Sequence, residues 1–357
     1  MRTYQQSFIG LLKNQNIKDN EHEILSLWQS LPVRERASLF IDTALLITLL
    51  RFIQEQYWIV NQEREEPAHF GNFVKKYFKS ELSLILFLHA SLESSVVTDI
   101  EEMRRNLLIL QKVILVEAVK HESNDHVVFA TECLKLMVDI FTFDQELHSQ
   151  YEDKKEVANF TLDRTFDVLD IVFNLDYKAE IQSGDLDETL ERIYQGSGVG
   201  VQSSYNTIIM ALNFLRLPQG ARLTDLGSGY GRVGLVITLL RPDIKFVGYE
   251  FVSNRVDLAN AAVKKLGIEK ELFFHQDLSS PEFKIPDAEV YYLFDPFTQE
   301  TYSHVIAQLN QVAAQRKIMI VTKGNAREQF TAINEKKNWS APQVLNYANF
   351  CLFRSRG

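Results

Sequence analysis

The chain has 357 residues, a hydrophobic content of 46% and a formal net charge of −9 at pH 7. Its length is sufficient for two domains, and its composition excludes an intrinsically disordered protein. The two cysteines, Cys133 and Cys351, are too few for a disulfide framework and predict buried, reduced thiols in a cytoplasm-like compartment.

Residues 1–193 are predicted to form an all-helical domain, because this part of the chain has helical apolar periodicity and few glycines. The expected helical runs are 32–60, 68–92, 98–121, 125–149 and 155–175. The first residues, MRTYQQSFIGLLKNQ, lack the pattern of a secretory signal. The apolar run 39–53 contains Asp42 and is shorter than the roughly 20 residues that a bilayer requires, so we expect a buried helix and no membrane partner.

Charge is distributed unevenly along the chain. Residues 1–195 have 20 Lys and Arg against 33 Asp and Glu, whereas residues 196–357 have 18 against 14. The acidic first part would repel nucleic acid, whose phosphates require an excess of cations. Its acidic helix faces are expected to be solvated, and recruitment of a basic partner is the alternative.

Acidic and histidine residues four positions apart occur twice, as Glu117 with His121 and Glu122 with His126. Di-metal sites in helical bundles use two Glu-x-x-His motifs on facing helices, and the sequence lacks such a set. No metal site is therefore predicted, and these histidines are expected to be solvated or to cap helices.

Residues 194–357 alternate short apolar runs with longer helical patterns, which is typical of a doubly wound parallel sheet. Strands are expected near 221–226, 244–249, 272–276, 288–294 and 316–322. The final stretch, PQVLNYANFCLFRSRG, has two strand patterns without a crossover helix between them. It predicts a hairpin that adds an antiparallel strand to the sheet.

A glycine-rich loop, LTDLGSGYGRVG at 223–234, follows the first expected strand. Gly229, Gly231 and Gly234 fit the GxGxxG turn that binds the pyrophosphate of a dinucleotide. Glu250 follows at a reasonable distance for an acid that binds a ribose hydroxyl. One hypothesis is therefore an oxidoreductase that uses a nicotinamide cofactor.

The end of the strand favours a different register. If the strand ends at Leu226, the spacing becomes GxGxG from Gly227 onward, Asp225 lies at the strand tip, and Gly234 is a packing position. A carboxylate at this tip would repel a pyrophosphate, but it would attract a ligand that carries an ammonium and a sulfonium. Asp225 therefore favours S-adenosylmethionine over a dinucleotide.

Four motifs occur in order: LTDLGSGYGRVGLV, FVGYE, FFHQDLSS and YYLFDPF. Together they resemble the class I S-adenosylmethionine-dependent methyltransferases over residues 194–357. The resemblance implies S-adenosylmethionine as cofactor and a seven-stranded Rossmann-like α/β domain, mostly parallel with an antiparallel last strand, after the all-α domain. The loop DLGSGYGR is also similar to those of small lysine methyltransferases and Dot1-like enzymes, over the loop and its flanks alone.

The resemblance also implies the residues that bind the donor. The acid at the position of Glu250 binds both ribose hydroxyls in this family, and the residue at the position of Asp277 reads the adenine amino group. The implied donor contacts are Asp225, Gly227, Gly229, Gly231, Glu250, Phe251, Asp277 and Leu278.

The stretch DPF supplies the implied catalytic residues, Asp295, Pro296 and Phe297, which would face the transferred methyl group. The Asp295 carboxylate and the Pro296 carbonyl would accept hydrogen bonds from an acceptor nitrogen, and the Phe297 ring would face a planar or cationic group. The amino-methylating members have two prolines here. The single proline leaves specificity for a base amino group open.

The segment YQGSGVGVQSSYN at 194–206 joins the two predicted domains. Similar segments in this class of enzyme close over the methionine end of the donor, which makes Tyr194, Gln202 and Ser203 candidate contacts. A lid and a plain hinge both remain open. Arg232, at the start of the helix after the loop, is expected to pair with a neighbouring acid.

The sequence thus predicts an enzyme that transfers a methyl group to a nitrogen of a protein, with the acidic helical domain, residues 1–193, selecting the substrate or binding a partner. A small molecule or a nucleic-acid base is the alternative acceptor. A noncatalytic interaction protein and a nicotinamide-dependent oxidoreductase are the remaining hypotheses.

Overall fold

The computed structural model describes residues 4–14, 16–19, 21–62, 64, 66, 68–121, 123–150, 158, 161–175, 202–294, 297–324, 326–333, 338–344 and 351–356. The chain divides into two compact units, Met1–Val172 and Phe173–Gly357, each of which is considered by itself. The predicted domain boundary at 193/194 lies outside the described residues.

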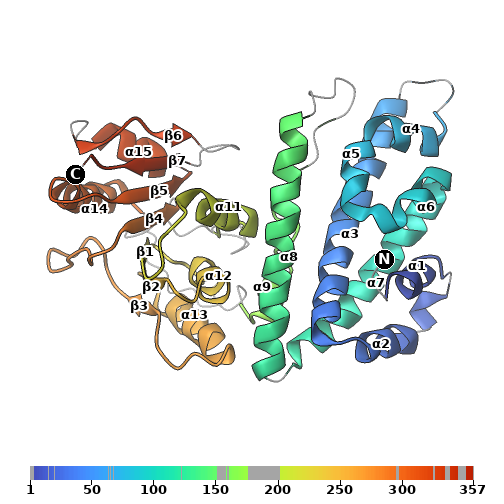
Figure 1. The fold of residues 1–357 in the computed structure, drawn as a ribbon, viewed down its shortest axis with the longest axis horizontal. Helices are drawn as coiled ribbons and strands as arrows, with labels where there is room; N and C mark the ends of the chain where they lie inside the picture. The colour runs from blue at the N-terminus through green and yellow to red at the C-terminus, as the bar shows by residue number, and fades with distance from the viewer. Residues whose placement is uncertain are drawn as a thin grey trace. The chain divides into compact units, whose positions relative to one another are not determined.

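The regular elements of the first unit are all helices over its described residues (Figure 1). Its elements are α1 Gln5–Leu12, η1 Ile17–Asp19, α2 Glu21–Ser30, α3 Val33–Asn61, α4 Phe70–Tyr77, α5 Lys79–Leu82, η2 Ser83–Leu88, α6 His89–Ser94, α7 Val97–Val119, α8 Ser123–Gln150 and α9 Leu169–Val172. Helix α3 packs against both α7 and α8. The consecutive residues Leu39, Phe40 and Ile41 are all buried, so α3 is covered on several faces and is the core helix of this unit.

Among the described residues, α3 is long and apolar enough to cross a membrane by length and composition, with a mean hydropathy of 1.6 over its most apolar window. However, 72% of that window is buried inside the protein, as expected for a core helix. The helix is longer than the apolar run 39–53 because it continues into more polar residues at both ends.

The single helix expected at 68–92 is wrong, because the structure has α4, α5, η2 and α6 in this region. Helical geometry is lost at Phe78, with φ −122° and ψ 18°, and at Ile85, with φ −133° and ψ 45°. Both side chains are fully buried, which indicates that their packing outweighs the local preference for a continuous helix.

The helix expected at 155–175 is also wrong where residues 161–168 are described, since these residues form turns and α9 covers only Leu169–Val172. Arg164 has a left-handed backbone with φ 61°, which interrupts a right-handed helix. Its guanidinium lies 3.0 Å from the Asp167 carboxylate.

The two histidines of the Glu/His pairs differ from their expected solvated positions. His126 is fully buried, and the half-buried His121 ring stacks on Trp28 with centroids 5.8 Å apart and an interplanar angle of 14°. His126 thus lies on a face of α8 that is turned toward the core, and His121 lies in the connection between α7 and α8, packed on Trp28.

The described strands of the second unit form a seven-stranded sheet in the order β3-β2-β1-β4-β5-β7-β6. The strands are β1 Arg222–Leu226, β2 Lys245–Glu250, β3 Phe273–His275, β4 Val290–Phe294, β5 Met319–Lys323, β6 Gln343–Val344 and β7 Cys351–Arg354. Strands β1 to β5 pair in parallel, whereas β7 is antiparallel to both β5 and β6. The predicted sheet and its antiparallel end are confirmed.

The helices of this unit cover both faces of the sheet (Figure 1). They are α11 Tyr205–Leu215, α12 Arg232–Leu240, α13 Ser253–Lys265, α14 Gln299–Ala313 and α15 Ala326–Ile333. Leu226, Tyr291 and Leu293 belong to a core that also contains buried residues of α14 and α15. Because neighbouring residues of a strand point to opposite faces, Asp225 and Tyr292 lie on the face of the sheet opposite to this core.

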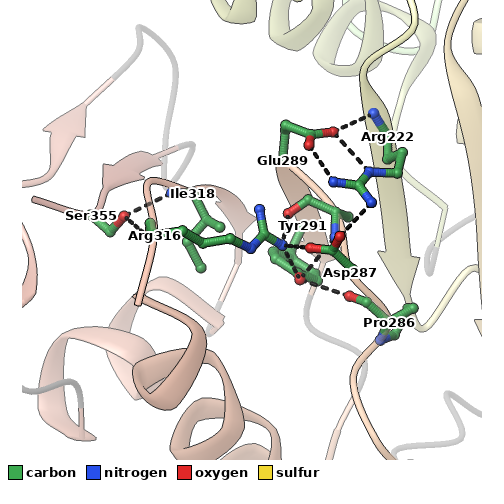
Figure 2. Close-up of polar contacts among 9 residues, drawn as sticks. Arg222, Pro286, Asp287, Glu289, Tyr291, Arg316, Ile318 and Ser355 are labelled. Carbon is green, nitrogen blue, oxygen red and sulfur yellow. Dashed lines mark hydrogen bonds and ion pairs between the residues drawn. The ribbon is translucent and has the colours of Figure 1, made fainter. Parts of the chain in front are cut away.

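At the amino-terminal edge of β1 and β4, charged side chains form a surface network (Figure 2). The Arg222 guanidinium lies 2.6 Å from Glu289 Oε1 and also contacts Asp287, which in turn contacts Arg316. The Arg222 hydrogen bonds lower the pKa of Glu289 to about 2. This network connects the central strands at the edge opposite to their carboxyl ends.

Candidate methyl-donor site

The sheet order reverses direction between β1 and β4, and open α/β sheets bind ligands at the carboxyl ends of strands beside such a switch. The loop after β1 begins there. The amides of Gly227 and Ser228 donate to the carbonyl of Tyr249, over 2.9 and 2.8 Å, so the loop is held across the end of β2. Helix α12 then starts at Arg232.

Asp225, which the sequence places at the tip of β1, is 2% exposed. Burial raises the pKa of its carboxyl well above the ordinary value, and the charge of Glu250 adds to the rise. No described group lowers it. An ammonium brought beside this carboxylate would offset the cost of burying its charge, whereas a pyrophosphate would increase that cost.

Glu250, at the end of β2, accepts hydrogen bonds from two backbone amides. Its Oε2 binds the amide of Gly229 at 2.8 Å, and its Oε1 binds the amide of Val252 at 3.1 Å. Arg255 lies 3.6 Å from the same carboxylate. A carboxylate has about four acceptor positions, so Glu250 can hold the loop and still accept ribose hydroxyls.

Two loop glycines are required for different reasons. Gly229 has φ 54°, and a Cβ on it would lie 2.7 Å from the Gln202 side-chain nitrogen, so the Gln202 amide lies directly against the loop. Gly231 has φ 83°, and a Cβ there would lie 2.6 Å from the Phe273 ring. Gly231 is therefore a packing position against β3, like Gly234, which lies close to the same ring.

The segment Gln202–Ser204 is buried beside the loop, with each of its three residues less than 5% exposed. The Ser203 and Tyr292 hydroxyls are 2.7 Å apart. Arg232 Nη1 donates to the Ser203 carbonyl over 2.8 Å. The candidate contacts Gln202 and Ser203 thus lie next to the loop. Arg232 was expected to pair with an acid, and the structure shows that it donates to a backbone carbonyl.

Two side chains at this site were not predicted. Tyr292 has its pKa raised by burial and by the charge of Asp225, and its hydrogen bond with the Ser203 hydroxyl opposes this rise. Lys323, at the end of β5, donates to the Thr207 hydroxyl over 2.8 Å. The period of two along β4 could have placed Tyr292 on the face opposite to its apolar neighbour Leu293, which belongs to the core.

The residues expected near the adenine differ in how deeply they are buried. Asp277 is half-buried, and its Oδ1 accepts hydrogen bonds from the amide and the hydroxyl of Ser279, over 2.8 and 2.6 Å, which forms an Asx turn. Leu278 is buried in the core with α14. Phe251 is half-buried, with its ring 6.4 Å from that of His275.

The implied catalytic stretch is described only in part. Asp295, Pro296 and the candidate contact Tyr194 lie outside the described residues. Phe297 is 2% exposed, and its ring packs edge-on against Tyr302 at 5.1 Å. This burial makes Phe297 part of the core between the sheet and α14.

The helical unit has a pocket of about 540 Å³, within the size range of ligand sites. It is lined by Gln5, Ile41, Asp42, Ser83, Leu84, Leu86, Phe87, Leu136, Asp139 and Ile140. The lining therefore combines six apolar side chains with two carboxyls and contains no basic residue.

No family model matches the chain. A stretch of 67 residues is 33% identical to ribosomal RNA small subunit methyltransferase G of Desulforamulus reducens. This match covers 19% of the present chain and 28% of that protein, so it spans less than a third of the curated relative.

Several solved structures are also similar to the chain. TrmN from Thermus thermophilus has 15% identity and a TM-score of 0.35, over 43% of this chain and 49% of its own. A TehB-like SAM-dependent methyltransferase from Corynebacterium glutamicum has 14% identity and a TM-score of 0.31, over 41% and 86%. Magnesium protoporphyrin IX methyltransferase from Synechocystis, solved with bound SAM, has 16% identity and a TM-score of 0.30, over 41% and 75%.

The predicted fold class and the resemblance to the class I methyltransferases are confirmed. The observed strand order with its antiparallel last strands is the fold of that class, and S-adenosylmethionine is its methyl donor. The residues present fit this donor, because Asp225 offers a buried carboxyl and the buried Ser228 hydroxyl of the loop has no hydrogen-bond partner among the described residues.

Proposed function

We propose that this protein is a class I S-adenosylmethionine-dependent methyltransferase that transfers the donor's methyl group to a nitrogen atom of a protein. The observation that supports the donor most directly is the buried Asp225 carboxyl beside the glycine loop, since this arrangement favours a cationic ligand. In this proposal, Asp225 binds the donor's ammonium and Glu250 binds its ribose.

The donor supplies an activated methyl group on a positively charged sulfur. In the transfer, the acceptor's lone pair forms a bond to the methyl carbon as the carbon–sulfur bond breaks, and its electrons remain on the now neutral sulfur. The chain then has to align the acceptor and exclude water. We assign acceptor binding to the Asp295 carboxylate and the Pro296 carbonyl, which can both accept hydrogen bonds from a nitrogen. Phe297 follows these two residues in the sequence and is itself buried.

A protein acceptor is supported by the charge of the first part of the chain, where residues 1–195 carry 33 acidic against 20 basic residues. The pocket with Asp42 and Asp139 has the same chemistry, since its apolar walls and carboxyls suit a basic side chain. We propose residues 1–193 as the domain that selects such a substrate. The buried Cys133 and Cys351, both free thiols, support a reducing, cytoplasm-like compartment.

RNA is the second candidate acceptor. It is favoured by the 33% identity to ribosomal RNA small subunit methyltransferase G over 67 residues. The positive net charge of residues 196–357, with 18 basic against 14 acidic residues, is compatible with phosphate contacts by this part of the chain.

The acceptor can be identified by incubating the purified full chain with methyl-labelled S-adenosylmethionine and cell extract separated into protein, RNA and small molecules. We expect label in protein that protease releases and ribonuclease does not. Label in RNA would contradict a protein acceptor and support RNA, the second candidate. Label in small molecules would contradict both candidates. Asp139→Asn and Asp139→Lys should lower labelling of protein progressively if the helical pocket selects a basic substrate.

A further inference from the structure

Arg232 is the most deeply buried cationic residue among those that the structure describes, with 1% of its surface exposed. It is the first residue of α12, directly after the glycine loop. Burial of a guanidinium is costly, and a side chain used only to start a helix could remain in solvent. Its contacts therefore indicate a specific task.

Those contacts connect the helix to the segment before α11. Arg232 Nη1 donates to the Ser203 carbonyl over 2.8 Å, and its guanidinium lies 4.6 Å from the centre of the Tyr205 ring. One planar group thus holds a backbone carbonyl and an aromatic face on either side of Ser204, a combination that an arginine can provide and a flexible ammonium cannot.

The position of this segment defines which end of the donor it would meet. Ser203 bonds to Tyr292, and Tyr292 is the register partner of Asp225 across the β1–β4 pair. Gln202 lies against Gly229. Glu250 is on the other side of β1, at the end of β2. Ser203 therefore lies on the Asp225 side of the loop, whereas Gln202 lies at Gly229, the residue whose amide donates to Glu250.

We propose that Arg232 is a positioning residue that fixes Gln202–Ser204 against the glycine loop and so builds the wall of the donor pocket that receives the amino-acid end of S-adenosylmethionine. This inference rests on the proposed donor site. In the intact site, Arg232 does not touch the donor. It acts by holding the Gln202 amide and the Ser203 hydroxyl in place before the donor arrives, which removes the cost of ordering them during binding.

The test compares two ligands by calorimetry on the full chain. S-Adenosylhomocysteine has the amino-acid end, whereas methylthioadenosine lacks it and keeps the adenosine. We expect Arg232→Met to weaken S-adenosylhomocysteine binding ~10-fold, as expected when one charge-assisted hydrogen bond is lost, and to change methylthioadenosine binding less than about twofold. Arg232→Lys should recover part of the loss, because an ammonium can still donate to the Ser203 carbonyl.

Arg241 provides a matched control on the same helix. It also donates to a backbone carbonyl, that of Leu217, over 3.0 Å, but it lies at the carboxyl end of α12. Arg241→Met should lower the thermal unfolding midpoint and leave both affinities unchanged. Because Arg232→Met could fail to fold, Ser203→Ala removes a positioned hydroxyl while Arg232 stays, and it should weaken S-adenosylhomocysteine selectively.

An equal loss of both ligands in the Arg232 and Ser203 variants would overturn the proposal, because it would indicate a general structural role. Unchanged S-adenosylhomocysteine binding in Arg232→Met would overturn it as well. If the unmodified chain binds neither ligand, the proposed function itself fails, and this outcome is distinguishable from a failure of the Arg232 proposal alone.

Discussion

Asp225 and Glu250 lie at the ends of neighbouring parallel strands, and the charge of Glu250 adds to the burial that raises the pKa of Asp225. Glu250 is engaged by the amides of Gly229 and Val252, whereas nothing among the described residues stabilises the charge of Asp225. Two nearby carboxyls thus have different environments, which is typical of sites that bind or react. The uncompensated charge of Asp225 is the feature that a cationic ligand would use.

Asp225→Asn should have opposite effects on stability and binding. The folded-state pKa of this carboxyl is raised, so its contribution to stability is present at low pH and is lost as the pH rises from the unfolded value through the folded one. Removing the ionisable group should therefore raise the thermal unfolding midpoint at neutral pH, a trade-off common at functional sites. Binding of S-adenosylhomocysteine should weaken ~10- to 100-fold, because a charge-assisted hydrogen bond is lost. Differential scanning fluorimetry and calorimetry on the same samples measure both, and a destabilised variant with normal affinity would contradict the assignment.

The affinity of the unmodified chain should depend on pH through the same group. Since the ammonium of the ligand requires the ionised carboxylate, binding should weaken as the pH falls through the raised pKa of Asp225 and strengthen as it rises. Titrations at a series of pH values test this, with Asp225→Asn as the control that should show a flatter profile. Binding that strengthens toward acidic pH would contradict the account.

Gly229→Ala should damage binding through the Gln202 contact. Gly229 and Gly220 both have a positive φ, of 54° and 78°, so alanine costs backbone strain at either position, typically about 1 kcal/mol. Only at Gly229 would the new Cβ meet the Gln202 side chain, because Gly220 has nothing within 4 Å. Gly229→Ala should thus lower S-adenosylhomocysteine affinity ~10-fold, roughly 1.4 kcal/mol, whereas Gly220→Ala should leave it unchanged. Equal S-adenosylhomocysteine affinities in the two variants would contradict a role of the Gln202 contact in donor binding.

Glu289→Gln should reduce acid sensitivity without affecting binding. The Arg222 hydrogen bonds lower the pKa of Glu289 from about 4.5 to about 2, so this carboxylate stabilises the fold above pH 4.5, and the contribution is lost as the pH falls toward 2 (Figure 2). Because the pair is partly exposed, solvent screening should keep the loss in the variant at pH 7 to ~2 °C in unfolding midpoint. The difference between the two proteins should shrink between pH 4.5 and 2. A constant difference across that range would contradict this role of Glu289.

Much of the second unit was predictable from the sequence, since its buried strands form short apolar runs separated by glycine and by helical periodicity. The position of Asp225 followed from the end of β1 at Leu226. The role of Arg232 did not follow, because its partner is a backbone carbonyl brought near by tertiary folding, and a carbonyl has no signature in the sequence. Gly231 has a φ of 83° as a turn glycine would, but its packing on Phe273 depends on the neighbouring strand.

The helical unit was less predictable. The break at Ile85 has no proline or glycine near it, so local propensity favoured one long helix until the burial of Phe78 and Ile85 decided otherwise. His126 was expected in solvent because histidine is polar, and its burial depends on which face of α8 packs inward.

The central claim, a donor site for S-adenosylmethionine at the loop after β1, is tested most directly by titrating the full chain with S-adenosylhomocysteine and, separately, with NADH. We expect S-adenosylhomocysteine to bind with a stoichiometry of one per chain, to be weakened by Asp225→Asn, and NADH to show no binding. Binding of NADH without binding of S-adenosylhomocysteine would contradict the account and restore the dinucleotide interpretation of the glycine loop.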